Sequence, residues 1–367
     1  MKRSIKKFLK VFSLLVLVLF FCATIVLFAT PYGHKLRTIA AESILTSQHP
    51  QYAKYTFLSK EELKSIDDAI HNPKSKNSDE MLNHSLSKKE LEKRKRAPLT
   101  ITVETVKEKF NDHFYEGKLM TISNPFNVKL VTQQGTQGDE FGEKIHVMAK
   151  RDHALAAVNA SGFADETGHG GGKTAIGTVI VDGKIINTHK GPDTSSVIAG
   201  LTKEGELLTG DYSPNQLLHK GVVSAAGFMP QLIVNGEKMI TSGNGGWGYG
   251  PRSIMAQKRD GTIMFLVIDG RQTHSIGASL KDCQDLLYEH GAYNAMAMDG
   301  GSSATIYAMG DVLNIPSTLS HQSRYLPNCW VVTANPEQKV EVTIDGKEAD
   351  QEKIAKISGL SSVAANE

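Results

Sequence analysis

Cysteine is scarce in this chain of 367 residues, which has three, at positions 22, 283 and 329. No pair of Cys or His residues has the spacing of a zinc site, and the His-Glu-x-x-His motif of zinc proteases is missing. Cys283 and Cys329 lie in apolar stretches, which predicts burial as small hydrophobic residues. A disulfide between them is permitted outside the cytoplasm, but two positions alone do not establish one.

The chain also lacks a strong excess of charge. It has 41 basic and 39 acidic residues, and five of the basic residues lie within the first ten positions. Residues 31–367 therefore carry 36 basic and 39 acidic side chains. Nucleic-acid-binding domains usually have a clear basic surface, so we expect no nucleic-acid partner. The basic run Lys88–Arg96 is typical of a solvated linker, with a contact to a polyanion as the alternative.

One long hydrophobic run is present, at Val11–Thr30, directly after the five positive charges. Twenty residues without a charge are enough to span the roughly 30 Å hydrocarbon core of a bilayer. The run is longer than the apolar part of most cleaved signal peptides, and no convincing cleavage site follows it. Because positive flanking charge stays in the cytoplasm, we expect a single-pass membrane anchor with the rest of the chain extracytoplasmic.

The sequence pattern predicts four parts. Residues 1–30 form the basic tail and anchor, and the polar residues 31–97 form a juxtamembrane stalk. Residues 98–335 have short apolar runs separated by Gly, Asn and Asp, which is typical of one domain with a sizeable core. Residues 336–367 form a polar C-terminal tail, with one hairpin turn at Asp345-Gly346.

Two apolar runs in the central domain each end at an Asp-Gly pair. Thr262–Ile268 precedes Asp269, and Asn294–Met298 precedes Asp299. Such runs predict buried strands. The segment between them predicts a helix, because Ser279 and Asp282 have the spacing of a capping box and Gly291 suits the end.

A strand–helix–strand unit of this kind predicts a mixed α+β (α/β) domain built on a mixed β-sheet. If the two strands are parallel, a right-handed crossover places Asp269 and Asp299 at one edge of the sheet. Open α/β sheets bind ligands outside the carboxyl ends of their strands. Asp-Gly pairs also form ordinary hairpin turns, as expected at Asp182 and Asp260, so a plain turn is the alternative at both positions.

Short motifs occur in a fixed order over about residues 100–335. They are Asn159-Ala160 with Gly162-Phe163, Ala175-Ile176-Gly177 before Asp182-Gly183, Pro230–Gly236, Pro251-Arg252-Ser253, Asp269-Gly270-Arg271, Gly277–Leu280, Asp299–Ser303, and Arg324 with Pro327-Asn328. This set resembles the phosphodiester glycosidase family. The resemblance implies cleavage of the bond between the anomeric carbon of a sugar and a phosphodiester, as in N-acetylglucosamine 1-phosphodiesters. Ala297 and Ser323 depart from the family pattern, which often has Asn and Glu there, and this leaves the sugar open.

The residue types in these motifs suit an anionic sugar phosphate. The planar fork of arginine binds phosphate oxygens in pairs, which makes Arg252 and Arg271 candidate ligands, with a salt bridge to an Asp as the alternative. The resemblance adds Arg324. Backbone N–H groups and hydroxyls for an anion come from Gly300, Gly301, Ser302 and Ser303.

Glycoside cleavage usually uses two carboxylates. We predict Asp299 as the nucleophile or general base, and Asp269 as its partner carboxylate or as a metal ligand. Asn159, after the apolar run Ala154–Val158, is predicted to bond a sugar hydroxyl, with capping of its own turn as the alternative. Two neighbouring acids could hold Ca²⁺ or Mg²⁺, so a divalent cation is left open, and no organic cofactor is indicated.

Two alternatives of other classes stay open. The stretches His169–Gly172 and Gly300–Ala304 are similar to serine hydrolase motifs, and Asp311 and His321 follow in the order of a triad. An elbow serine leads into a helix, however, whereas Ser303–Ala308 predicts a strand. The other alternative is a non-catalytic protein for glycan binding or exopolysaccharide assembly on the same fold. We expect the enzyme, acting on a phosphate-linked surface glycan or cell-wall polymer.

Overall fold

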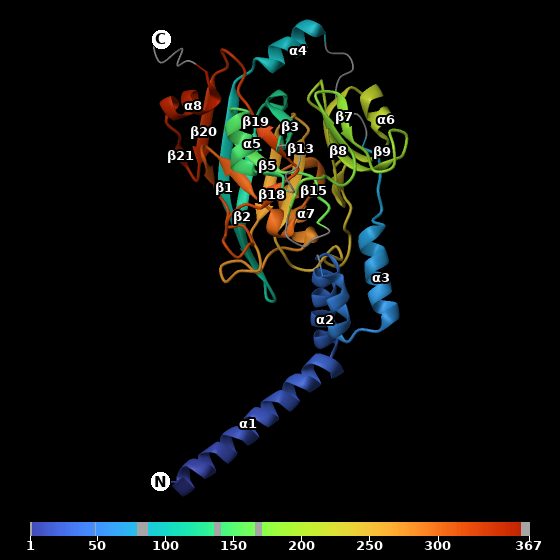
Figure 1. The fold of residues 1–367 in the computed structure, drawn as a ribbon, viewed down its shortest axis with the longest axis vertical. Helices are drawn as coiled ribbons and strands as arrows, with labels where there is room; N and C mark the ends of the chain where they lie inside the picture. The colour runs from blue at the N-terminus through green and yellow to red at the C-terminus, as the bar shows by residue number, and fades with distance from the viewer. Residues whose placement is uncertain (1, 48, 79–86, 136–140, 166–170, 361–367) are drawn as a thin grey trace. The chain divides into compact units, whose positions relative to one another are not determined.

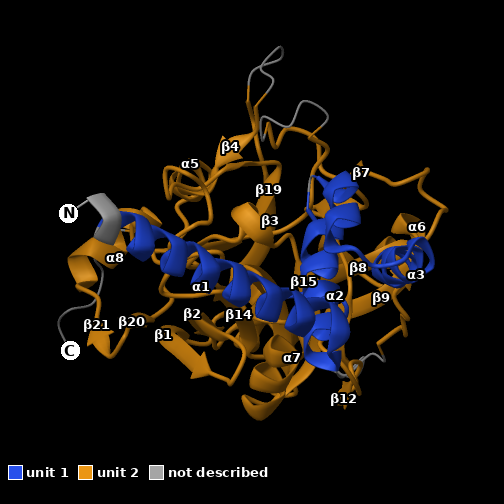
Figure 2. Cartoon of the chain, turned by 90° about the horizontal axis from the view of Figure 1, so that it is seen from below, with its two compact units in different colours: residues 1–72, 246–248 blue, residues 73–245, 249–367 orange. Residues whose placement is uncertain are grey.

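The computed structural model describes residues 2–47, 49–78, 87–135, 141–165 and 171–360. The chain divides into two compact units, coloured separately in Figure 2. The first consists of residues 1–72 with 246–248, and the second of residues 73–245 with 249–367.

The first unit is helical. It contains α1 (Lys2–Ala29), α2 (Pro31–Leu45), the 3-10 helix η1 (Pro50–Thr56) and α3 (Lys60–His71). Helix α2 begins at Pro31 because the Thr30 side chain accepts a hydrogen bond from the Gly33 N–H and Pro suits the first helical position. Among the described residues, Ile5–Ala29 is the one helical stretch long and apolar enough to cross a membrane. Length and composition therefore agree with the anchor predicted there, although a signal sequence has the same properties.

The described residues of the second unit form four sheets, the largest with nine strands in the order β12-β11-β15-β13-β14-β2-β1-β20-β21. These strands are β1 (Leu99–Lys109), β2 (Phe114–Ile122), β11 (Gln231–Val234), β12 (Glu237–Lys238), β13 (Arg252–Lys258), β14 (Ile263–Ile268), β15 (Ala292–Met298), β20 (Val340–Ile344) and β21 (Lys347–Glu348). Neighbours are antiparallel except β1 and β20, which are parallel. The predicted mixed sheet and mixed α+β class are confirmed.

Two five-stranded sheets and a two-stranded sheet complete the strands of the second unit, in the orders β7-β6-β10-β8-β9, β17-β16-β5-β19-β3 and β18-β4. Their bounds are β3 (Val128–Thr132), β4 (Glu143–Lys144), β5 (Ala156–Asn159), β6 (Val179–Val181), β7 (Lys184–Asn187), β8 (Ser196–Thr202), β9 (Leu207–Tyr212), β10 (Val222–Gly227), β16 (Ile306–Ala308), β17 (Asp311–Val312), β18 (Tyr325–Leu326) and β19 (Asn328–Val332). The helices are α4 (Lys88–Lys95), η2 (Pro125–Asn127), α5 (Ile145–Arg151), α6 (Pro214–His219), α7 (Leu280–Glu289), η3 (Gly301–Ser303) and α8 (Gln351–Ser358).

The largest core cluster draws on all three of the larger sheets, with Phe265 from β14, Ala199 from β8 and Trp330 from β19 among its fully buried residues. Strand β14 is buried along its whole length. This burial on both faces explains why its sequence is apolar without alternation.

Strand β14, helix α7 and strand β15 form the predicted strand–helix–strand unit. Both strands pair antiparallel with β13, which lies between them, so β14 and β15 run in the same direction. Helix α7 begins after Ser279, which forms a capping box with Asp282, and Gly291 follows its last turn with a φ of 86°. The parallel arrangement and both helix ends are confirmed.

The C-terminal segment differs from the polar tail predicted for residues 336–367. Strand β20 extends the large sheet beside β1 (Figure 1). Ile354 of α8 is part of the main core. The hairpin turn at Asp345-Gly346 joins β20 to β21, as predicted. The signal for the strand was the alternation of Val340 and Val342 with polar residues.

Part of the predicted stalk also belongs to the second unit, because residues 73–78 lie along β9. The Ser78 N–H donates to the Thr209 carbonyl at 2.8 Å, and the Asp211 N–H donates to Asn77 Oδ1 at 2.7 Å. Further along this stretch, the Lys76 N–H donates to Gln231 Oε1 at 2.9 Å.

Neither Cys283 nor Cys329 forms a disulfide, and both are buried. Cys283 is on the inner face of α7, whereas Cys329 lies on β19 with its Sγ 3.9 Å from the Sδ of Met148. Desolvation raises the pKa of both thiols well above the usual range. The predicted burial is confirmed.

Candidate active site

The carboxyl ends of β14 and β15 meet the beginning of β13 at one edge of the large sheet. Arg252 pairs with Ile268 and Ser253 with Met298, so Asp269 and Asp299 both follow at this edge. The glycines after them permit close packing. A Cβ on Gly270 would lie 2.6 Å from the Pro251 nitrogen, and one on Gly300 would lie 2.8 Å from the Pro251 carbonyl oxygen. Only glycine fits this approach of three backbone segments.

The turn after β15 is fixed by Asn159, the last residue of β5. Its Nδ2 donates to the Asp299 carbonyl at 2.6 Å, and its Oδ1 accepts from the Thr305 N–H at 3.0 Å. The Asp299 N–H in turn donates to the Ala160 carbonyl at 3.0 Å. Asn159 is fully buried. Its amide thus holds the turn after β15 and not its own turn, which was the predicted alternative, and it has no exposed surface for a sugar hydroxyl.

Asp299 is half-buried at the start of this turn. Desolvation by the surrounding protein raises its pKa to about 6, while a hydrogen bond from Ser303 and the charge of Arg324 act in the opposite direction. A carboxyl group with a pKa near neutrality is populated in both protonation states where enzymes work. Such a group is suited to nucleophilic or acid–base chemistry.

Arg271 is the exposed cation beside the same turn. Its Nη1 lies 3.7 Å from the position that a Cβ on Gly301 would take. The backbone of Arg271 is left-handed, with a φ of 59°, which is uncommon for a residue other than glycine. Desolvation lowers the pKa of the guanidinium. In the described part of the chain, no acidic side chain lies within ion-pair distance of Arg271.

Arg324, in contrast, has an acidic partner. Its Nη2 lies 3.0 Å from Asp165 Oδ2, and its Nη1 donates to Ser302 Oγ at 3.0 Å. The guanidinium carbon is 4.9 Å from the centre of the Phe163 ring. Asp165 was missed by sequence reasoning, since the residues that follow Phe163 form no recognisable motif; its nearness to Asn159–Phe163 was the available signal.

Arg252 faces a different neighbour. It is buried at the start of β13, and its Nε donates to the Ala278 carbonyl at 3.0 Å. Its charge lowers the pKa of Cys283 on α7 against the larger effect of desolvation. These contacts place Arg252 against the loop before α7. A phosphate contact by Arg252 stays a prediction.

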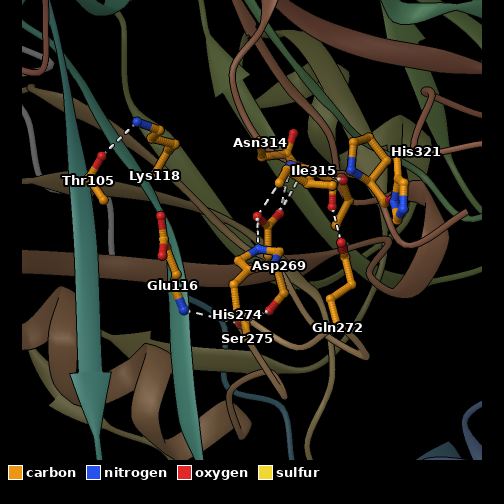
Figure 3. Close-up of polar contacts among 12 residues, drawn as sticks. Thr105, Glu116, Lys118, Asp269, Gln272, His274, Ser275, Asn314, Ile315 and His321 are labelled. Atoms are coloured by element: carbon orange, nitrogen blue, oxygen red, sulfur yellow. Dashed lines mark hydrogen bonds and ion pairs between the residues drawn. The ribbon is translucent and has the colours of Figure 1, made fainter.

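Asp269 joins two loops (Figure 3). Its Oδ1 accepts from Asn314 Nδ2 at 3.0 Å and from the Ile315 N–H at 3.1 Å, and its Oδ2 lies 3.0 Å from His274 Nε2. Asn314 also accepts from the Ile306 N–H and donates to the Ala304 carbonyl, which links Asp269 to the segment after Asp299. The Asp269 carboxylate is surrounded by N–H donors, and N–H groups do not ligate a cation. The contacts therefore favour a hydrogen-bonded anchor over the predicted metal ligand.

His274 is the titratable group that the Asp269 network presents to solvent, and it was also missed by sequence reasoning. Its side chain is 29% exposed, against 6% for Asp269. It lies at the tip of a short loop that begins with Arg271 and is closed by an N–H of Arg271 on the Ile276 carbonyl at 2.9 Å. Gln272 donates to the Ile315 carbonyl at 2.7 Å and holds this tip against the neighbouring loop (Figure 3).

The serines of the turn lack the setting of a hydrolase nucleophile. Ser302 and Ser303 lie in η3, which is followed by β16 and not by a helix. Ser302 accepts from Arg324, and Ser303 bonds Asp299. His169 and Gly170 of the serine hydrolase alternative lie outside the described residues.

The question of a metal also depends on the side chains at this edge. Across the described ranges, no group of three or more His, Cys, Asp or Glu side chains is arranged to hold a metal ion. The sequence left open whether a divalent cation binds, and the described residues provide no set of ligands for one.

Comparisons with known proteins agree with the fold and the motifs. Residues 152–333 match the family described as phosphodiester glycosidase. N-acetylglucosamine-1-phosphodiester alpha-N-acetylglucosaminidase of Bos taurus is 25% identical over 236 residues, which are 59% of this chain and 43% of that protein. The SPbeta prophage-derived protein YomE of Bacillus subtilis is 26% identical over 180 residues, 47% of this chain and 27% of that protein. The chain thus spans less than half the length of either curated relative.

A solved structure has the same fold. The catalytic domain of zebrafish N-acetylglucosamine-1-phosphodiester alpha-N-acetylglucosaminidase, auto-inhibited by its pro-peptide, superposes with a TM-score of 0.56 at 19% identity. The match covers 74% of this chain and 93% of the solved chain. With the family match and the motifs at the sheet edge, it confirms the resemblance predicted from the sequence: residues 152–333 are similar to the phosphodiester glycosidase family.

Proposed function

We propose that the protein hydrolyses a sugar 1-phosphodiester, breaking the bond between the anomeric carbon and the phosphate oxygen. The observation that carries this proposal is the position of Arg271. Arg271 is an exposed residue, and its guanidinium has no acidic partner among the described residues and lies beside the Gly300-Gly301 turn. A cation of this kind next to a glycine-rich backbone suits a phosphate, which arginine binds through paired hydrogen bonds.

Asp299 is the reacting carboxylate in this proposal. In its ionised form it attacks the anomeric carbon or removes a proton from the attacking water. The anomeric carbon gains a hydroxyl group from water, and the phosphate monoester leaves with the electron pair of the broken bond. A phosphate is already a good leaving group, so holding its charge matters more than protonating it. Arg271 and the backbone of the turn provide that charge stabilisation.

Asp269 has a positioning role in the proposal, because both of its oxygens are engaged by N–H donors. It fixes the loop that carries Arg271 and His274 against the segment that follows Asp299. In this proposal His274, which Asp269 orients, takes the partner role that was predicted for Asp269. His274 is the exposed group of this pair.

The family match and the similarity to the Bos taurus N-acetylglucosamine-1-phosphodiester alpha-N-acetylglucosaminidase support the substrate class. We propose the same kind of linkage in a surface glycan or cell-wall polymer. In this arrangement α1 anchors the protein and the second unit lies outside the cytoplasm. The two departures from the family pattern, Ala297 and Ser323, are both buried and lie outside the contacts described for Asp299 and Arg271.

The direct test is release of N-acetylglucosamine from its 1-(4-nitrophenyl phosphate) diester by the full-length chain in detergent. Asp299→Asn is the matched control, and each protein is assayed with and without EDTA. Turnover that is lost in the control supports the proposal, and the EDTA arm reports whether a divalent cation takes part. Absence of turnover, with glycan binding that survives Asp299→Asn, would instead establish the non-catalytic alternative.

A further inference from the structure

The two arginines near the turn after Asp299 differ in how their charge is balanced. Arg324 forms an ion pair with Asp165 at 3.0 Å, and the two side chains are 15% and 6% exposed. The negative charge of Asp165 therefore offsets much of the attraction that Arg324 would exert on a third charged group. Arg271 has no such partner among the described residues. An incoming phosphate is therefore attracted by Arg271, whereas the carboxylate of Asp165 opposes its approach to Arg324.

The geometry of Arg324 shows what the pair holds in place. One arm of the guanidinium bonds Asp165, the other donates to Ser302 Oγ at 3.0 Å, and its plane lies near the Phe163 ring. Three sides of the guanidinium are thus engaged before any ligand binds. Ser302 follows Asp299 by three residues, and the charge of Arg324 acts on Asp299.

We propose that Asp165 is a positioning residue of the candidate active site. It holds Arg324 against Ser302 and balances its charge, so that the phosphate of the substrate is taken by Arg271 and not by Arg324. The inference rests on the proposed function only in that the ligand is a phosphate. In this inference Arg271 binds the phosphate of the ligand, whereas Arg324 holds the turn that carries Ser302.

The test uses inorganic phosphate as the probe, because its binding does not require turnover. Affinity is measured by isothermal titration calorimetry on the full-length chain in detergent. Four proteins are compared, namely the wild type, Asp165→Asn, Arg271→Gln and Asp345→Asn. Asp345 lies in the β20–β21 hairpin and forms an ion pair with Lys118 outside the site. Asp345→Asn removes one negative charge, as Asp165→Asn does, and so controls for the change in net charge.

We expect Asp165→Asn to bind phosphate severalfold more tightly, because the charge of Arg324 is then unbalanced. Arg271→Gln should lose most of the affinity, and Asp345→Asn should match the wild type. The double variant Asp165→Asn with Arg324→Gln should lose the gain, which assigns that gain to Arg324. Thermal unfolding of each variant confirms that the proteins compared are folded.

Weaker binding in Asp165→Asn would overturn the inference, because it would make Arg324 a phosphate ligand that Asp165 orients. Unchanged binding would also overturn it, because Asp165 would then not balance Arg324. These outcomes are distinct from failure of the proposed function. A protein that shows the expected binding pattern without hydrolysing the phosphodiester would retain the division of roles and lose the enzymatic activity.

Discussion

His274 Nε2 lies 3.0 Å from Asp269 Oδ2, and the imidazole is the exposed member of this pair. The carboxylate beneath it also accepts from Asn314 and from the Ile315 N–H. The carboxylate of Asp269, which the sequence predicted to act directly on the substrate, is thus engaged by hydrogen bonds within the protein. Asp269 therefore affects a reaction through the loop that it fixes.

Replacing Asp269 by Ala should destabilise the fold strongly. The Ile315 N–H and the Asn314 amide would lose their acceptor in a buried place, which costs roughly 2–4 kcal/mol of the free energy of unfolding. His274→Ala breaks one bond at a partly exposed side chain and should cost less than about 1 kcal/mol. Denaturant unfolding of the two variants measures the difference. Equal stabilities would refute the anchoring role of Asp269.

Turnover should depend on Asp299 and on its ionisation. Asp299→Asn should abolish hydrolysis, because the amide neither attacks nor accepts a proton at neutral pH. With the pKa of Asp299 raised to about 6, the rate of the wild type should fall as the pH is lowered through about 6. The measurement is kcat/KM from pH 4.5 to 8 (about the range over which a group of this pKa titrates). A rate that rises on the acid side would make Asp299 a general acid.

The same raised pKa predicts a pH-dependent cost to stability. The pKa of Asp299 is about 6 in the folded chain and near the ordinary value of 3.8 when unfolded, so folding favours the protonated form. Stability from this group is therefore present below about pH 4 and declines as the pH rises to about 6. Asp299→Asn should be more stable than the wild type at pH 8 (by about 1–2 kcal/mol, since the group is half-buried) but not at pH 4. Melting curves at the two pH values decide this.

Arg271→Ala should weaken substrate binding more than the chemical step. The guanidinium holds the phosphate in the ground state and in the transition state, so KM should rise about tenfold or more while kcat changes less. Arg271→Lys keeps the charge but lacks the planar fork, so its KM should lie between those of the wild type and Arg271→Ala. Steady-state kinetics on the three proteins separates the parameters. An equal loss of kcat and kcat/KM would mean that Arg271 acts only in the transition state.

The buried thiols should be inert in the folded chain. Because desolvation raises the pKa of Cys283 and Cys329, neither should react with Ellman's reagent under native conditions. Both should react after denaturation without a reductant, since neither is in a disulfide. A Cys22→Ser background removes the exposed thiol of α1 from the count. Protection that persists in denaturant would indicate a disulfide.

Local signals in the sequence predicted local structure well. The apolar run before Asp269 is β14, the Ser279–Asp282 spacing caps α7, and Asp260-Gly261 is a hairpin turn. Each depends on residues close together in the chain, where periodicity and turn chemistry act directly. The same signals predicted that Asp269 and Asp299 share one edge of the sheet.

The contacts within the site could not be predicted in this way. Asp165 and Arg324 are 159 positions apart, and no local pattern marks either as the partner of the other. The burial of Asn159 likewise depends on the turn 140 residues later, to which its side chain bonds. Such pairs are set by the packing of whole sheets, which the sequence pattern of one segment does not contain.

The parallel pairing of β20 with β1 sets how far the chain can be shortened. A protein cut after residue 335 would keep every residue of the candidate active site but lose the strand that covers β1. The uncovered N–H and C=O groups of β1 would then form a template on which a second chain could add a strand. We therefore expect such a truncated protein to self-associate although its candidate active site is complete. A fragment that stays monomeric has to extend through α8.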